Sequence, residues 1–317
     1  MFNLKQFWFN LLKWLLVILL STYLMVQLQS DHQNFSKVTQ VLQFQFEKHP
    51  YLIPFLLILS SLNWILEIKK WQILIRKFRS VSFGEASKQT LSSHSFSLVT
   101  PFKSGDYIFK TLFFERDKKL QILALNALGN LTQLGITLVM GMLGFGVLFL
   151  FYQNTFAFEM NTSVILGFVF VIILLTIILI LYKPSFLGQH WTKIKILNRH
   201  NLYKILSFSL LRYLLFSHQF YFILLIFGVD LPYVLVMCLI FLTYVVSSIL
   251  PVFTLFDFVI KGSAALFVFS KWGISESILF TTTTLMWLMN FVLPAMIGVW
   301  VILTLKREQF ALKPKQK

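Results

Sequence analysis

Long apolar stretches separated by short polar segments run along nearly the whole chain. A bilayer core about 30 Å thick is crossed by roughly 20 apolar residues of helix. This pattern predicts eight spans, at residues 8–28, 50–68, 128–152, 162–182, 205–228, 232–250, 254–270 and 278–304. The sequence therefore predicts an all-α protein, a polytopic membrane helical bundle that forms a single integral membrane domain over residues 1–317.

The segment at residues 83–114 fits this pattern less simply. It is rich in apolar residues, but it also holds Lys88, His94, Lys103, Asp106 and Lys110. Such a segment is too polar for a span that faces lipid, so we expect it to be re-entrant or to lie at the interface. The span at 254–270 is the weakest of the eight, and the sequence leaves open whether either segment crosses the membrane.

Composition and charge support a membrane location and indicate an orientation. The chain is 57% hydrophobic and only 13% charged, yet its formal net charge is +16. The basic residues concentrate in three segments, with eleven at 69–119, five at 183–204 and five at 306–317. Lys and Arg are biased toward cytoplasmic loops. We therefore expect a cytoplasmic (inner) membrane protein with both termini in the cytoplasm, and no nucleic-acid partner.

Two short segments resemble each other. They read SLVTPFKSGDYIFK and SSILPVFTLFDFVIK, and each has a Pro, then an Asp, then a Lys four residues after the Asp. The residues are Pro101, Asp106 and Lys110 in the first, and Pro251, Asp257 and Lys261 in the second. Pro breaks a helix, and an Asp–Lys spacing of four places both charges on one helical face. Two interpretations stay open: self-neutralising interfacial pairs, or a possible inverted repeat of Pro-broken elements around a central site.

Polar positions inside two spans are further candidates. Asn126, Asn130, Gln133 and Thr137 fall on one helical face, either for hydrogen bonding between helices or for lining a hydrophilic groove. Arg212 lies within the span at 205–228. It fits a contact to phosphate as well as it fits snorkelling to the interface.

Motifs for catalysis are missing from the sequence. It has no nucleophile elbow, no zinc-type His pair and no phosphate-binding glycine loop. Its single cysteine, Cys238, excludes a disulfide within the chain and any site built from several cysteines. We expect no enzyme activity, no catalytic residue, no metal and no cofactor.

The residues also point to a family. The stretches NWILEIKKWQILIRKF and SFGEASKQTLSSHSFSLVTPFKSGDYIFK resemble the first half of the flippase-like membrane domain of lysylphosphatidylglycerol synthases and their stand-alone relatives. The shared Pro-basic-x-Gly-acidic motif is Pro101, Lys103, Gly105 and Asp106. The resemblance covers residues 64–300. It departs after Pro251, where VFTLFDFV replaces a Gly-rich turn.

The resemblance implies an eight-span domain that moves a phospholipid or another amphipathic lipid between leaflets. Four cations would attract an anionic headgroup, Lys103, Lys110, Arg212 and Lys261. Asp106 and Asp257 would hold these cations in place, beside the breaks at Pro101 and Pro251. Lysyl transfer is not expected, because the aminoacyl-transferring domain is absent. The alternatives are a membrane-embedded lipid-modifying transferase and a non-transporting partner in envelope assembly. The sequence does not predict which lipid is bound, the energy source or the oligomeric state.

Overall fold

The regular structure in the described part of the chain is helical. The computed structural model describes residues 40, 43–44, 47–48, 50–98, 100, 104–152, 198–249 and 257–305. Its helices are α3 (Leu52–Ile75), α4 (Phe83–Leu98), α5 (Ser104–Thr111), α6 (Lys119–Phe151), α9 (Arg199–Ile226), α10 (Tyr233–Ile249), α11 (Asp257–Phe269), α12 (Glu276–Trp287) and α13 (Leu293–Thr304). A π-helical turn, η5 (Leu288–Val292), joins α12 to α13.

Four helical stretches are long and apolar enough to cross a membrane. They are Leu52–Ile75, Arg116–Phe151, Arg199–Ile226 and Glu276–Thr304. They correspond to the predicted spans at 50–68, 128–152, 205–228 and 278–304. Three of them extend well beyond the predicted limits, because hydrogen bonding along the backbone continues past the point where charged residues lower the hydropathy.

The other predicted spans are not equivalent to these four. The span predicted at 254–270 corresponds to α11, whose 13 residues reach only about 20 Å at 1.5 Å per residue. The span predicted at 232–250 corresponds to α10, a shorter apolar helix of 17 residues. The spans predicted at 8–28 and 162–182 lie outside the described residues. A total of eight crossings therefore stays a prediction.

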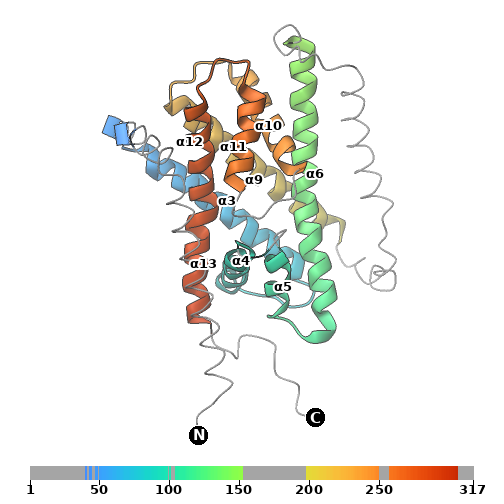
Figure 1. The fold of residues 1–317 in the computed structure, drawn as a ribbon. Helices are drawn as coiled ribbons and strands as arrows, with labels where there is room; N and C mark the ends of the chain where they lie inside the picture. The colour runs from blue at the N-terminus through green and yellow to red at the C-terminus, as the bar shows by residue number, and fades with distance from the viewer. Residues whose placement is uncertain are drawn as a thin grey trace, which may run out of the picture.

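The long helices frame a set of shorter ones. In Figure 1 the column formed by α12, η5 and α13 stands on one side and α6 on the other. The short helices α4 and α5 lie between them toward one end, and α10 and α11 toward the other. Helix α3 packs on α9, α4 packs on α13 and α5, and α10 packs on α6 and α11.

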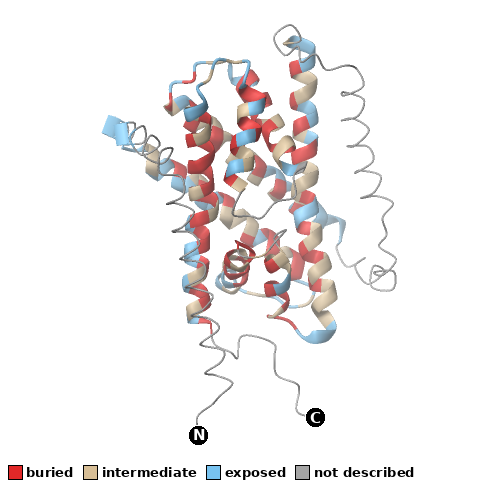
Figure 2. Cartoon of the chain, in the orientation of Figure 1, coloured by how far each residue is buried: buried red, intermediate tan, exposed pale blue. Residues whose placement is uncertain are grey.

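The buried apolar residues form two main clusters. One cluster contains residues of α9, α10, α11 and α12, among them Tyr213, Phe220 and Phe269. The other contains residues of α3, α6 and α13, among them Trp71 and Ile122. Figure 2 shows buried segments at both ends of the bundle. The same helices also carry the polar residues that are described below.

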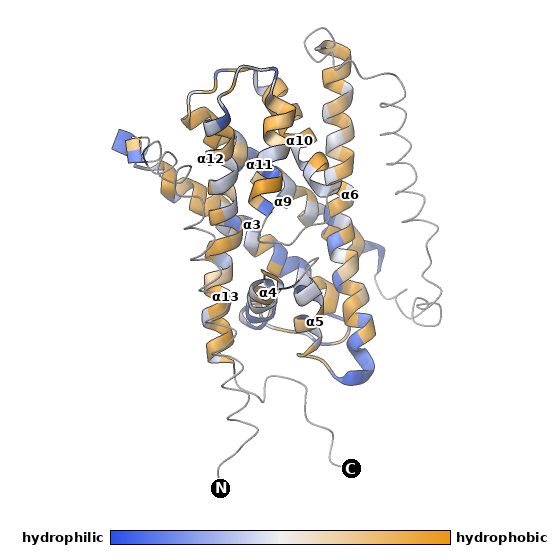
Figure 3. Cartoon of the chain, in the orientation of Figure 1, coloured by the Kyte–Doolittle hydropathy of each residue, from blue (hydrophilic) through white to orange (hydrophobic). Residues whose placement is uncertain are grey.

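The outer faces of the long helices are apolar. On α6, Leu143 and Phe151 are 58% and 76% exposed, and on α13 Trp300 is 66% exposed. Figure 3 shows the hydrophobic colouring that dominates both helices. Apolar faces this extensive are unfavourable in water and suit contact with lipid. The described fold is therefore that of a membrane-embedded helical bundle.

Helix α4 is polar and yet enclosed by protein. Its buried serines donate hydrogen bonds to backbone carbonyls, with Ser97 Oγ 2.6 Å from His94 O and Ser95 Oγ 2.7 Å from Ala295 O of α13. Gly298 lets α13 approach closely, since a Cβ there would collide with Leu91 O. The polar segment at 83–114 is thus divided into α4, most of whose serines are buried, and α5, which buries Lys110 but exposes Ile108.

Candidate functional site

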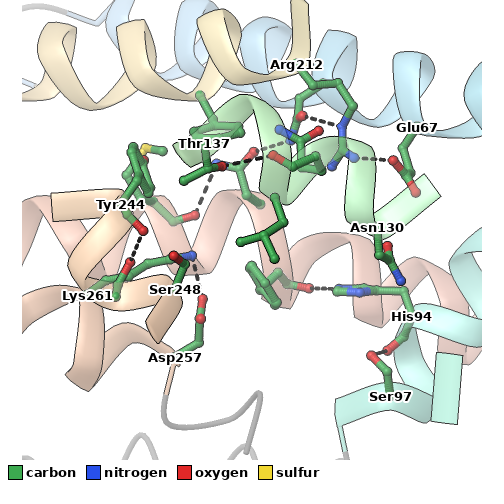
Figure 4. A pocket seen from close by; sticks show the side chains of 18 of the residues that line it. Glu67, His94, Ser97, Asn130, Thr137, Arg212, Tyr244, Ser248, Asp257 and Lys261 are labelled. Atoms are coloured by element: carbon green, nitrogen blue, oxygen red, sulfur yellow. Dashed lines mark hydrogen bonds and ion pairs between the residues drawn. The ribbon is translucent and has the colours of Figure 1, made fainter. Parts of the chain in front are cut away.

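A polar cavity of about 490 Å³ lies among the helices. It is lined from α3, α4, α5, α6, α9, α10, α11, α12 and η5. Its lining includes three carboxylates and three cations, Glu67, Asp106, Asp257, Lys110, Arg212 and Lys261. Figure 4 shows Arg212 and Glu67 together on one side of the cavity and Asp257 and Lys261 together on another. Ionised groups this deep in an apolar bundle are costly unless each has a partner.

The first ion pair, Asp106 with Lys110, is almost fully enclosed. Lys110 Nζ lies 3.0 Å from Asp106 Oδ1 and 2.8 Å from Asn126 Oδ1, and it lies 4.6 Å from the ring centroid of Trp71. Asp106 also accepts hydrogen bonds from Ser93 Oγ at 2.6 Å and Asn126 Nδ2 at 2.7 Å. The Lys110 side chain is only 2% exposed. The Lys110 ammonium therefore makes its contacts with groups of the protein.

The second ion pair, Asp257 with Lys261, is more accessible. Lys261 Nζ lies 2.6 Å from Asp257 Oδ2, and the two side chains are 24% and 23% exposed. The ammonium also faces two aromatic rings, with centroids 5.1 Å away for Phe291 and 6.0 Å for Tyr244. The predicted i,i+4 pairing of Asp with Lys is confirmed in both helices.

A third charged cluster centres on Glu67. Its Oε2 lies 2.7 Å from Lys70 Nζ and also accepts a hydrogen bond from Arg212 Nη1. Arg212 Nε donates to Asn63 Oδ1 at 3.0 Å, and Lys70 Nζ donates to Gly129 O at 3.2 Å. The sequence interpretation gave Glu67 and Lys70 no role. The signal was an acidic residue one helical turn before a lysine at the end of an apolar run.

Amide side chains connect Arg212 to the π-helical turn. Asn63 Nδ2 donates to Asn290 Oδ1 at 3.1 Å, and Asn290 Nδ2 donates to Gln219 Oε1 at 2.8 Å. The backbone oxygen of Asn290 accepts a hydrogen bond from Trp64 Nε1 at 3.1 Å. A π-turn often marks a functional site within a helix. Here it places Asn290 where three helices meet.

The polar face of α6 lines the cavity. Asn130, Gln133 and Thr137 belong to the lining, and Asn126 holds the first ion pair. These three positions fit the groove-lining interpretation, and Asn130 also fits the alternative, because its Nδ2 donates to Tyr107 Oη of α5 at 2.9 Å. The side-chain amide of Gln133 is buried and has no hydrogen-bond partner in the described part of the chain.

Five of the eight predicted site residues meet in this one cavity. They are Asp106, Lys110, Arg212, Asp257 and Lys261. Pro101, Lys103 and Pro251 lie outside the described residues. The two aspartates line the same cavity although they are 151 positions apart. The inverted repeat itself stays a prediction.

The three carboxylates and three cations that line the cavity balance, and Lys70, which lies behind the lining, adds a fourth cation. The described carboxylates are Glu67, Asp106 and Asp257, and the cations paired with them are Lys70, Lys110, Arg212 and Lys261. The excess positive charge belongs to the cluster around Glu67, where one carboxylate serves two cations. Arg212 is 17% exposed and lines the cavity, so an anion can reach it.

A metal site does not emerge from the same residues. Across the described ranges, no group of three or more His, Cys, Asp or Glu side chains is placed to hold a metal ion.

These features define an integral membrane protein with a charged internal cavity. Residues 11–298 match the family model described as the lysylphosphatidylglycerol synthase TM region. The chain belongs to this family, as the resemblance in its sequence predicted. No curated protein and no solved structure gave a significant match.

The enclosed pair yields a test of stability. Replacing Lys110 by Met strands the Asp106 carboxylate, so we expect the free energy of unfolding to fall by about 3–5 kcal/mol. The double variant Asp106→Asn with Lys110→Met should lose less, since no unpaired charge is left. The measurement is reversible unfolding in detergent micelles. Lys118→Met is the control, because its pair with Glu115 is exposed and should have no measurable effect. A Lys110→Met protein as stable as the wild type would contradict this account.

Proposed function

We propose that this protein moves an anionic phospholipid, or another amphipathic lipid with an anionic headgroup, between the leaflets of its membrane. The headgroup would enter the polar cavity while the acyl chains stay in lipid. The observation that carries the proposal is a cavity whose lining holds three carboxylates and three cations, with a fourth cation, Lys70, paired to Glu67 behind the lining. The helices around it have apolar outer faces. Membership of the family supports a role in lipid metabolism, because the family is described as the membrane region of a lipid synthase.

Arg212 is the best candidate for the contact with the headgroup. A guanidinium presents planar donors that match two phosphate oxygens at once. Arg212 reaches the cavity, and the carboxylate that neutralises it is shared with Lys70. Lys261 is a second candidate, because its pair with Asp257 is the more accessible of the two i,i+4 pairs. Lys110 would act indirectly by holding Asp106.

The dimensions and polarity of the cavity also fit a headgroup. About 490 Å³ falls within the range of roughly 300–1,000 Å³ that is usual for small-molecule sites. Gln133, Asn130 and Thr137 line the cavity from one face of α6. These neutral groups suit hydroxyl or ester oxygens beside a phosphate.

We also propose that the protein lies in the cytoplasmic (inner) membrane with both termini in the cytoplasm. The support is the concentration of Lys and Arg in three segments, one of which directly precedes α6. A reporter inserted after Lys118 should be cytoplasmic and one inserted after Tyr152 exoplasmic. Paired alkaline phosphatase and fluorescent protein fusions measure this. Two reporters on the same side would contradict the assignment of α6 as a crossing helix.

The direct test of lipid movement uses Arg212→Gln. The substitution removes the accessible cation but leaves Glu67 paired with Lys70, so the protein should still fold. Loss of a charge-assisted hydrogen bond worth about 1.5–3 kcal/mol predicts a rate lower by roughly 10- to 100-fold. The assay follows dithionite bleaching of tail-labelled phosphatidic acid in phosphatidylcholine vesicles that contain the protein.

Arg79→Gln is the matched control for this assay. Arg79 pairs with Glu85 at 2.7 Å, and the two side chains are 52% and 41% exposed. A change there should leave the rate of lipid movement unaltered. Wild-type vesicles that bleach no faster than protein-free vesicles would overturn the proposed function.

A further inference from the structure

Glu67 binds two cations that differ in their access to the cavity. Its side chain is 15% exposed and belongs to the cavity lining, as does Arg212 at 17%. Lys70 lies behind them, is 1% exposed and does not line the cavity. The carboxylate thus has one partner that a ligand can reach and one that it cannot.

The carboxylate of Asp106 is held differently. Its ion-pair partner is Lys110, whose ammonium also donates to Asn126 Oδ1 at 2.8 Å. Drawing Lys110 toward a ligand would take the cation away from a partly buried carboxylate, which is costly. Arg212 can leave Glu67 at lower cost, because Lys70 stays 2.7 Å from Oε2 and is itself anchored by Gly129 O.

We propose that Glu67 is the release group of the headgroup site. It neutralises Arg212 while the cavity is free, yields the guanidinium to an incoming phosphate, and takes it back when the phosphate leaves. Lys70 keeps Glu67 charged and in position throughout the exchange. This inference rests on the proposed function and assigns the site a ligand chemistry, a phosphate group carried by a lipid.

The exchange predicts opposite effects on binding and on movement. Without the negative charge of Glu67, Arg212 and Lys70 both attract phosphate with no competitor, so binding tightens. Release then slows, because no carboxylate is present to reclaim the guanidinium. A purely structural role for Glu67 predicts instead that binding and movement weaken together.

The test compares Glu67→Gln with the wild type in two measurements. Titration calorimetry in detergent micelles uses lysophosphatidic acid and, separately, inorganic phosphate as probes. Vesicle bleaching follows tail-labelled phosphatidic acid. We expect Glu67→Gln to bind lysophosphatidic acid about tenfold more tightly, the order expected for removing one competing charge at a partly buried site. Lipid movement should be slower than in the wild type.

Three further variants make the result specific. Glu67→Asp keeps the charge and should restore movement. In Lys70→Met, Glu67 pairs with Arg212 without competition from Lys70, so the guanidinium is held more strongly and the binding of phosphate should weaken. Glu85→Gln removes an exposed carboxylate outside the cavity lining and should change neither measurement. Thermal unfolding checks that each variant is folded.

The outcomes separate this inference from the proposed function. Folded Glu67→Gln that binds lysophosphatidic acid no more tightly than the wild type overturns the release role, even if the wild type moves lipid. Tighter binding in a protein whose wild type moves no lipid supports the counter-ion exchange and overturns lipid movement. If Glu67→Gln tightens the binding of inorganic phosphate but not of lysophosphatidic acid, the ligand is not a lipid headgroup.

Discussion

Charged side chains inside this apolar bundle need partners, and the arrangement of the helices supplies them. Each carboxylate of the cavity has a cation within 3.0 Å in the described residues. An unpaired charge would be far less stable there than in water, so each carboxylate lies beside a cation. Pairing within one helix holds Asp106 and Asp257, whereas Glu67 joins α3 to α9 through Arg212.

The polar side chains around these charges also need partners. Polar groups inside a membrane must be satisfied by protein or by water. The serines of α4 donate to carbonyls, and Asn290 on the π-turn bonds both Asn63 and Gln219. Short helices and a π-turn are therefore tolerated here because they border a cavity and their polar groups find partners within the protein. The same features leave polar atoms facing the cavity.

The parts of the site that depend on residues close together in the sequence could be predicted from the sequence. The Asp–Lys pairs and the polar face of α6 depend on spacings of three and four residues, which can be read from sequence. The i,i+3 pair of Glu67 with Lys70 is also a local spacing and could have been predicted, whereas no spacing rule connects Glu67 to Arg212, 145 positions away. The span at 254–270 was predicted from composition, which does not reveal that α11 is only 13 residues long. Its apolar residues serve packing against α10 and α12.

In the proposed function a lipid headgroup occupies the charged cavity while its acyl chains remain outside. Photo-crosslinking can test this with two phosphatidic acid derivatives, one with the reactive group next to the phosphate and one with it at the end of an acyl chain. We expect the first derivative to label peptides lining the cavity, around Asn130 and Arg212, and the second to label the outer faces of α6 and α13, around Leu143 and Trp300. If both derivatives label only the outer faces, the headgroup does not enter the cavity.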